Sequence, residues 1–408
     1  MHEITEKSKQ KGFIIISIML FSFSVLKVIR GADTSITTEG GIWNYISLLY
    51  YIVAIIGVIY NRTFKAKAIF VAPLLYSVFS MIFALGNKSV GTSFNKIYVF
   101  LMIPYFFLVF VSFYFFSEPS LKAEKIILLA YIVCLLINAY TIIGFLLFNR
   151  SRAMANDVYY SLCLFPFALL FVKNKKWKTI VIVLQFFVTF LSNKRSGFIA
   201  LCIGLVLYFL LEANNDNRNN FFKMLGRMVM IIVAVYVMYE VSYYLDSSLG
   251  LGIYDRLNRL ETDDGSGRGR MYVAVWQGIR NSNWFDVLFG HGMNSAGRVA
   301  GAGYAHNDFL EVLYDYGVVS FVCIVVYFVS LIRYAIQMII RKSPYAPAFA
   351  FSMVIGITLS MFSYFLIFYT FVTCIMAFWG YVLKMETSRI SEVTDFDCKQ
   401  ERLEEDML

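Results

Sequence analysis

The side chains best suited to chemistry lie in one hydrophilic stretch, roughly residues 247 to 316. It contains a set of arginines but no lysine: Arg256, Arg259, Arg268, Arg270, Arg280 and Arg298. A planar guanidinium can hold two oxygens of a phosphate at once, which a point-like ammonium cannot. The stretch therefore indicates a substrate that carries phosphate.

The stretch ends in Ala305-His306-Asn307-Asp308-Phe309-Leu310-Glu311, where we expect an amphipathic helix to open at His306. The chain has only 3 histidines, and an imidazole is suited to proton transfer at neutral pH. Asp308 or Glu311 could set the tautomer of His306 or replace it as the base. A structural explanation also exists, because the helix dipole favours carboxylates in a first turn.

A second helix is predicted over residues 270–279, with Val273, Trp276 and Ile279 on one face and Ser266 as its cap. Arg268 and Arg270 would then lie at a helix amino terminus. Backbone N–H groups and the helix dipole there would help these arginines to hold an anion.

The connection between the two helices is rich in glycine, and we expect it to be a bent, mobile linker. No Walker or dinucleotide pattern is present. The adjacent acids Asp263 and Asp264 resemble a divalent-ion site only superficially, and the linker separates His291 from His306. We therefore expect no metal and no cofactor.

The elements that must position these residues are those of a membrane protein. The composition is 59% hydrophobic and 15% charged, and the apolar runs have the length of about 18 to 25 residues that spans a bilayer. The runs do not alternate in polarity, as the strands of a membrane barrel would. We predict an all-α, polytopic chain with spans near 12–30, 42–60, 68–86, 97–116, 125–148, 157–172, 178–192, 196–211, 228–246, 317–340, 348–365 and 368–384.

The predicted domains follow from these spans. Residues 1–246 hold the first nine spans, 247–316 form one large catalytic loop, 317–385 hold the last three spans, and 386–408 form a cytoplasmic tail. The first span lacks a small-residue cleavage site, so we expect it to be retained. The 6 cysteines are scattered, which favours packing residues over disulfides or a thiolate metal site.

The net charge of +9 has a topological explanation that needs no nucleic acid, because cytoplasmic loops are enriched in Lys and Arg. With Lys7, Lys9 and Lys11 inside, most basic loops fall on the cytoplasmic side and residues 247–316 face out. The outward-facing Arg150, Arg152, Lys194 and Arg195 oppose this trend. Each could be a solvated surface charge, but we expect function for Arg195, which is confined to a turn between two spans.

The ordered motifs resemble the O-antigen polymerase and O-antigen ligase superfamily of bacterial envelope glycosyltransferases. Residues 190 to 340 carry the resemblance, through Lys194-Arg195-Ser196-Gly197, Ser266-Gly267-Arg268 with Tyr272 where the family often has tryptophan, Phe289-Gly290-His291-Gly292, and the His306 motif with Gly317.

The resemblance implies a GT-C-like membrane glycosyltransferase, metal-independent and inverting, on the outer face of the bacterial cytoplasmic membrane. Donor and acceptor would be undecaprenyl-pyrophosphate-linked oligosaccharides, and a flippase and a chain-length regulator are possible partners. By motif position, His306, Arg195 and Arg268 would be catalytic. Charge and proximity add a substrate-binding set: Arg270, Lys194, Arg152, Asp308 and Glu311.

Three functions are compatible with this sequence. We favour a Wzy-type polymerase of O-antigen, capsular or exopolysaccharide repeats. A ligase that moves polymer to lipid A core or another acceptor would share the donor and the chemistry. A flippase for the same lipid is the alternative from another class, but transporters usually bind at mid-membrane within repeated halves, and only Lys27, Glu240 and Arg333 are charges that we place within spans.

Overall fold

The computed structural model describes residues 6–32, 41–60, 67–86, 103–144, 157–215, 221–249, 254, 267–301, 304–363, 366 and 369–406. Within these ranges the ordered elements are all helices and no strand occurs, which confirms the all-α prediction.

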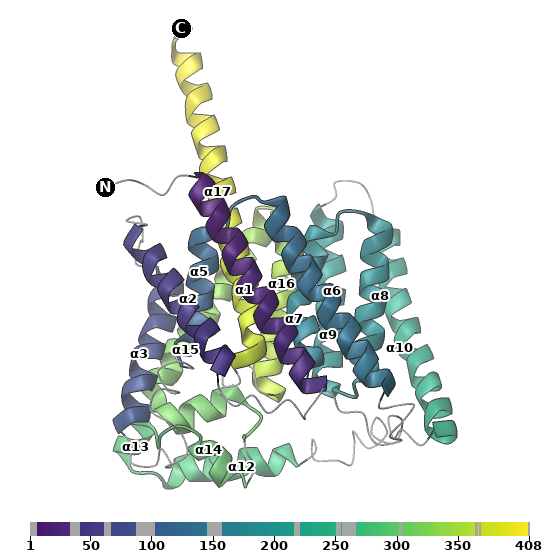
Figure 1. The fold of residues 1–408 in the computed structure, drawn as a ribbon, viewed down its shortest axis with the longest axis vertical. Coiled ribbons are helices and arrows are strands. Elements are labelled where there is room, and N and C mark those ends of the chain that lie inside the picture. The colour runs from purple at the N-terminus through teal and green to yellow at the C-terminus, as the bar shows by residue number, and fades with distance from the viewer. Residues whose placement is uncertain are drawn as a thin grey trace.

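Long helices run roughly side by side along the vertical axis of Figure 1, and each overlaps one of the spans expected from sequence. They are α1 (Glu6–Ala32), α2 (Gly41–Tyr60), α3 (Ala68–Gly86), α5 (Tyr105–Phe116), α6 (Leu121–Gly144), α7 (Val158–Phe171), α8 (Lys175–Leu191), α9 (Arg195–Asn215), α10 (Phe221–Leu249), α15 (Asp308–Ile340), α16 (Ala346–Phe362) and α17 (Tyr369–Asp406).

Three short helices lie across one end of this bundle, which we call the loop end: α12 (Arg268–Asn281), α13 (Trp284–Phe289) and α14 (Ser295–Val299). The start of α1 and the end of α17 lie at the opposite end (Figure 1). The chain therefore gathers the candidate residues of its hydrophilic stretch on the face remote from both described ends.

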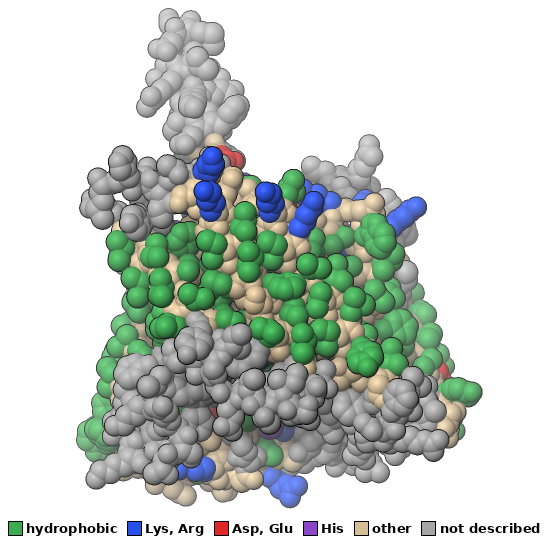
Figure 2. All heavy atoms as spheres, viewed as in Figure 1, with side chains coloured by type: hydrophobic (Ala, Val, Ile, Leu, Met, Phe, Trp, Pro, Cys, Tyr) green, Lys and Arg blue, Asp and Glu red, His purple; other side chains and the backbone are tan. Residues whose placement is uncertain are grey.

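The surface of the bundle is that of a membrane protein. On the face shown in Figure 2 an apolar band crosses the bundle, and Lys and Arg side chains gather along the edge away from the loop end. Among the described residues, 4 helices are long and apolar enough to cross a membrane: Lys7–Ile29, Leu121–Gly144, Arg195–Ala213 and Asp308–Ile340. Shorter apolar helices accompany them. The count of twelve spans and the side faced by the loop end stay predictions.

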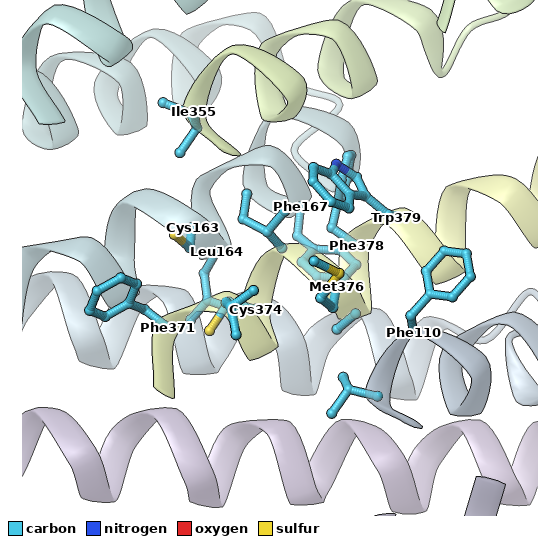
Figure 3. Packing of buried hydrophobic residues seen from close by; sticks show 14 of the residues in the cluster. Phe110, Cys163, Leu164, Phe167, Ile355, Phe371, Cys374, Met376, Phe378 and Trp379 are labelled. Atoms are coloured by element: carbon cyan, nitrogen blue, oxygen red, sulfur yellow. The ribbon is translucent and has the colours of Figure 1, made fainter. Parts of the chain in front are cut away.

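The centre of the bundle is packed with aromatic rings from α5, α7 and α17, together with apolar side chains such as Ile355 of α16 (Figure 3). Phe167 meets Phe378 edge-to-face with ring centroids 5.0 Å apart, and the indole N–H of the fully buried Trp379 donates to the Ser352 hydroxyl over 2.9 Å. Cys163 and Cys374 are buried and unbridged within this packing, in agreement with a packing role.

Helix α15 is divided by a kink. Gly317 has φ 76 and ψ 177, so the helix axis is interrupted there. An unbroken helix of 33 residues would be about 50 Å long, well beyond the roughly 30 Å of bilayer hydrocarbon. The kink therefore separates residues 308–316, at the loop end, from the rest of α15. A membrane-crossing part that follows Gly317 stays a prediction.

The sequence prediction for α12 needs two corrections. The helix begins at Arg268, and its N-cap is Gly267 in the left-handed region (φ 80) rather than Ser266, because glycine adopts that conformation without steric cost. Val273 and Trp276 do not face the core: they are 55% and 51% exposed, whereas Val275 is fully buried.

The glycine-rich connection is also more ordered than expected. It contains α14, and short hydrogen-bonded turns surround that helix. His306 does not open the helix that follows, because Asn307 is the N-cap and the helix starts at Asp308. Asp263 and Asp264 lie outside the described residues.

Candidate active site at the loop end

Helix α12 is fastened to the carboxyl end of α16. The Arg268 guanidinium donates through Nη1 to the carbonyl oxygen of Phe362. The last carbonyls of a helix have no partner within it, so an arginine there is well placed. The Tyr272 hydroxyl lies 3.3 Å from the carbonyl oxygen of Met361 and 3.0 Å from that of His306. Arg268 and Tyr272 thus join α16 to the His306 turn.

The backbone around His306 is held in an unusual conformation. His306 has φ 59, a left-handed conformation that costs energy for a residue with a side chain. The Glu311 Oε1 accepts hydrogen bonds from the backbone N–H of Ala305 and from that of His306, the latter at 3.1 Å. Asn307 caps the helix by accepting from Leu310 N–H over 3.1 Å. These bonds fix the direction in which the imidazole leaves the backbone.

The imidazole of His306 lies in an electropositive environment. Burial, together with the charges of Arg268 and Lys194, lowers its pKa to about 4. The ring is therefore neutral at neutral pH. Because Lys194 belongs to the turn between α8 and α9, the structure brings that turn within electrostatic range of His306, on which Arg268 also acts.

The α8–α9 turn is supported by buried polar side chains. The Ser192 hydroxyl donates to the carbonyl of Thr189 over 2.6 Å, and the Ser196 hydroxyl lies 3.0 Å from that of Tyr159. Asn193 takes a left-handed conformation with φ 58, which turns the chain sharply. Lys194 follows, and Arg195 is the first residue of α9; both side chains are half-buried.

Three buried carboxylates occupy the segment between the His306 turn and the kink. Asp308, Glu311 and Asp315 are at most 1% exposed. Asp308 accepts from the backbone N–H of Leu366 over 2.7 Å, and Asp315 accepts from those of Asn294 and Ala296, each over 2.7 Å. Together with Glu311, these carboxylates tie three stretches of backbone to one helical segment.

The carboxylates also affect one another's ionisation. Burial raises the pKa of Glu311 well above its usual range, and Asp315 and Asp308 add to that rise. Burial raises the pKa of Asp315 to about 7, although its backbone N–H donors oppose the change by stabilising the ionised form.

The Phe289-Gly290-His291-Gly292 motif packs directly on the α15 kink. Gly290 and Gly317 both have positive φ, and a Cβ on either would lie 2.2 Å from a carbonyl oxygen, that of Asp315 or Leu288 respectively. The His291 ring stacks on Tyr314 with centroids 4.0 Å apart, and its Nδ1 donates to the Tyr314 carbonyl over 3.1 Å. Two glycines are needed here because the backbones touch.

The remaining arginine candidates are not placed by the structure beside His306. Arg270 lies in the first turn of α12 and is exposed, with no described contact to His306. Arg152, Arg256 and Arg259 lie outside the described residues. Among the residues that are described, no group of three or more His, Cys, Asp or Glu side chains could hold a metal ion.

Sequence reasoning missed two contributors. The α16–α17 region supplies Met361, Phe362 and Leu366 through backbone atoms, which no residue type signals. Asp157, just before α7, is the second. Burial raises its pKa to about 6, while Lys194 and Lys27 oppose that rise, so this carboxylate lies within electrostatic range of Lys194. The sequence feature that could have revealed Asp157 is an acidic residue at the start of an apolar span.

Comparison with known families bears on this same region. Residues 180–325 match the family model described as O-antigen ligase. The matched segment contains the Lys194–Arg195 turn, α12 to α14 and the His306 turn, so the resemblance to the O-antigen polymerase and ligase superfamily is confirmed over that part of the chain. No curated protein matches the sequence.

Proposed function

We propose that this membrane protein, whose residues 180–325 match the O-antigen ligase family, is a polysaccharide polymerase. It joins undecaprenyl-pyrophosphate-linked oligosaccharide repeats into O-antigen, capsular or exopolysaccharide on the outer face of the bacterial cytoplasmic membrane. One observation carries the proposal: Arg268 and Lys194, distant in sequence, both act on the half-buried imidazole of His306. Two cations beside a neutral imidazole suit a pyrophosphate leaving group and an attacking hydroxyl.

The reaction follows from these charges. The acceptor hydroxyl oxygen attacks the anomeric carbon and its proton passes to His306. The bond from that carbon to the pyrophosphate oxygen breaks, and the lipid pyrophosphate leaves with the electron pair. Preorganised cations in a partly dry site stabilise the developing charge, with about 3 kcal/mol for one such donor. Attack opposite the leaving group inverts the anomeric centre.

The bound donor also makes His306 a better base. In the empty site Arg268 and Lys194 hold its pKa down. A pyrophosphate between these cations offsets their charge, so the pKa of His306 rises toward its ordinary value. Proton acceptance is thereby coupled to the presence of the donor.

The other candidates take supporting roles in this proposal. Arg195, next in the chain to Lys194, is a further catalytic cation, and Arg270 and Arg152 contact pyrophosphate or glycan. Glu311 and Asp308 are positioning residues, because they hold the backbone on both sides of the site. No metal or cofactor takes part. A flippase and a chain-length regulator are proposed partners.

The test is chain extension by the purified protein in liposomes, with a lipid-linked repeat as the only sugar substrate and a chelator present. The proposal expects a ladder of products from the wild type and none from His306→Ala, which should remain folded and inserted. His2→Ala is the matched control, because it removes a histidine from the amino terminus. A full ladder from His306→Ala removes that residue from the mechanism.

A ligase is the second candidate, and the description of the matched family favours it. The same assay separates the two. A ligase transfers preformed polymer only when a second acceptor such as lipid A core is added, whereas a polymerase needs none.

A further inference from the structure

Helix α13 presents large apolar side chains on its outer surface. Trp284 is 73% exposed, Phe285 55% and Leu288 36%. Trp284 and Phe285 occupy the first turn of the helix, which Asn283 caps by accepting from Asp286 N–H over 2.9 Å. A well-formed helix that exposes adjacent aromatic rings needs a partner that covers them.

A ladder of aromatic rings connects this surface with α3. Phe79 stacks on Phe83 with centroids 6.1 Å apart, Phe83 meets Phe289 at 5.1 Å, and Phe289 meets Phe285 at 4.8 Å. Trp284 completes the ladder at 6.0 Å from Phe285. The rings thus run without interruption from an apolar bundle helix onto the loop end.

The surface of α3 on which this ladder begins has the character of a lipid-facing surface. Leu74, Leu75, Val78 and Ile82 are 43%, 39%, 37% and 55% exposed, at the spacing of one helix face. They lie on α3, whose residues Ala68–Ala84 form one of the apolar helices of the bundle. The exposed surface of α13 therefore continues a surface that faces hydrocarbon, at the end where that helix leaves the bilayer.

We infer that Trp284 and Phe285 insert into the headgroup layer of the bilayer, so that the partner of α13 is the lipid surface. Aromatic rings concentrate at this boundary because one part of them is apolar while the layer tolerates polar neighbours. The continuity with α3 favours lipid over a second copy of the chain or another protein.

The anchored helix is rigidly joined to the candidate site. Gly290, directly after α13, packs on the backbone of Asp315, and Gly317 packs on that of Leu288. The same segment of α15 holds the His306 turn through Glu311. If the proposed function is correct, α13 sets the height of His306 relative to the lipid phosphates, where the pyrophosphate of the donor lies.

Tryptophan fluorescence tests the insertion without requiring activity. The wild type and Trp284→Phe are placed in nanodiscs of plain lipid and of lipid brominated near the top of its acyl chains, and the emission lost on substitution is assigned to Trp284. Trp276→Phe, the same exchange at a position 51% exposed on α12, controls for the loss of an exposed loop tryptophan.

We expect the Trp284 emission to be quenched by brominated lipid and protected from aqueous acrylamide. Quenching by acrylamide alone would show that the ring faces water, and protection from both quenchers would show that protein covers it. Either result overturns the inference. If lipid quenching occurs but no polymer forms, the anchor stands and only the proposed function fails.

A kinetic measurement tests whether α13 sets the height of His306 relative to the lipid phosphates. In an active preparation, Trp284→Asp should raise KM for the lipid-linked donor several-fold with a smaller change in kcat, because the donor is misplaced while the reacting groups are intact. An unchanged KM in a variant whose emission shows that α13 has left the lipid would refute that role.

Discussion

His306 is a weak base in the empty site, because burial and two cations lower its pKa to about 4. The pH profile of kcat/KM reports the ionisation of the protein without bound donor. We therefore expect kcat/KM to fall only below roughly pH 5, where His306 becomes protonated. The profile of kcat should fall on the acid side at a higher pH, because bound pyrophosphate offsets Arg268 and Lys194. Initial rates of extension between about pH 4 and pH 8 measure both profiles. Identical midpoints would contradict the proposed coupling.

Arg268 is proposed to have two roles: it holds α12 to the end of α16, and it binds the phosphate of the substrate. Its fork donates to the Phe362 carbonyl and leaves other N–H groups for phosphate, an arrangement that a single ammonium cannot reproduce. We expect Arg268→Lys to lower kcat/KM by roughly 10²- to 10³-fold, the loss typical of a transition-state donor. Arg280→Lys, on the exposed last turn of the same helix, should retain activity. Wild-type kinetics in both would show that charge alone suffices.

Glu311 supports the His306 turn through a side-chain oxygen that accepts two backbone N–H groups. Glu311→Ala leaves these amides without an acceptor at about 1–3 kcal/mol each, so the unfolding midpoint in detergent should fall clearly. Glu311→Gln keeps the acceptor oxygen, and because burial already favours the uncharged acid its midpoint should stay near that of the wild type. Equal midpoints for the two variants would show that these bonds add nothing.

At the scale of the elements, a helix could be predicted from the sequence where its apolar residues form a long run or a repeating pattern. Long apolar runs gave the position of every bundle helix, because each run must satisfy its backbone within a bilayer. The buried face of α12 was predicted wrongly. Its contacts with Tyr314 and Ala296 come from distant segments, and these decide that Val275 rather than Val273 is buried. Helices α13 and α14, with 6 and 5 residues, are too short to show a period.

The contact between the glycine motif and the kink makes an element-scale prediction. Gly317→Ala adds the cost of a left-handed conformation, roughly 1–2 kcal/mol, to a collision with the Leu288 carbonyl. Gly301→Ala incurs only the first cost, because its φ is also positive but nothing lies within 4 Å of the added Cβ. We expect a much larger fall in unfolding midpoint for Gly317→Ala. Similar falls would mean that the backbones separate without loss.

At the scale of the whole molecule, the described ends of the chain lie opposite the loop end (Figure 1). The side of the membrane that each end faces stays a prediction from the basic loops. The contacts that the α16–α17 region makes with the candidate site could not be predicted from the sequence. Its contribution consists of backbone carbonyl and amide groups, and any sequence offers those. Only the three-dimensional packing of α16 beside α12 and the His306 turn reveals it.

The predicted orientation can be measured with cysteine reporters. Val299→Cys, 40% exposed at the loop end, should react with a membrane-impermeant maleimide in intact cells. Lys175→Cys, at the opposite end of the bundle at the start of α8, should react only after permeabilisation. The wild type is the background control for the native cysteines, of which Cys134, Cys163 and Cys374 are buried and Cys202 and Cys323 are half-buried. The reverse labelling pattern would place the loop end in the cytoplasm.

The buried carboxylates of residues 308–315 bear on how this protein can be handled. Asp308 takes its amide partner from Leu366, beyond the next membrane helix, and Arg268 takes its carbonyl partner from Phe362. A fragment excised at residues 247 and 316 would lack both attachments, and its acids would become hydrated. Antibodies raised against such a fragment would select conformations that the intact protein does not display, so immunogens and binders need the whole chain in lipid.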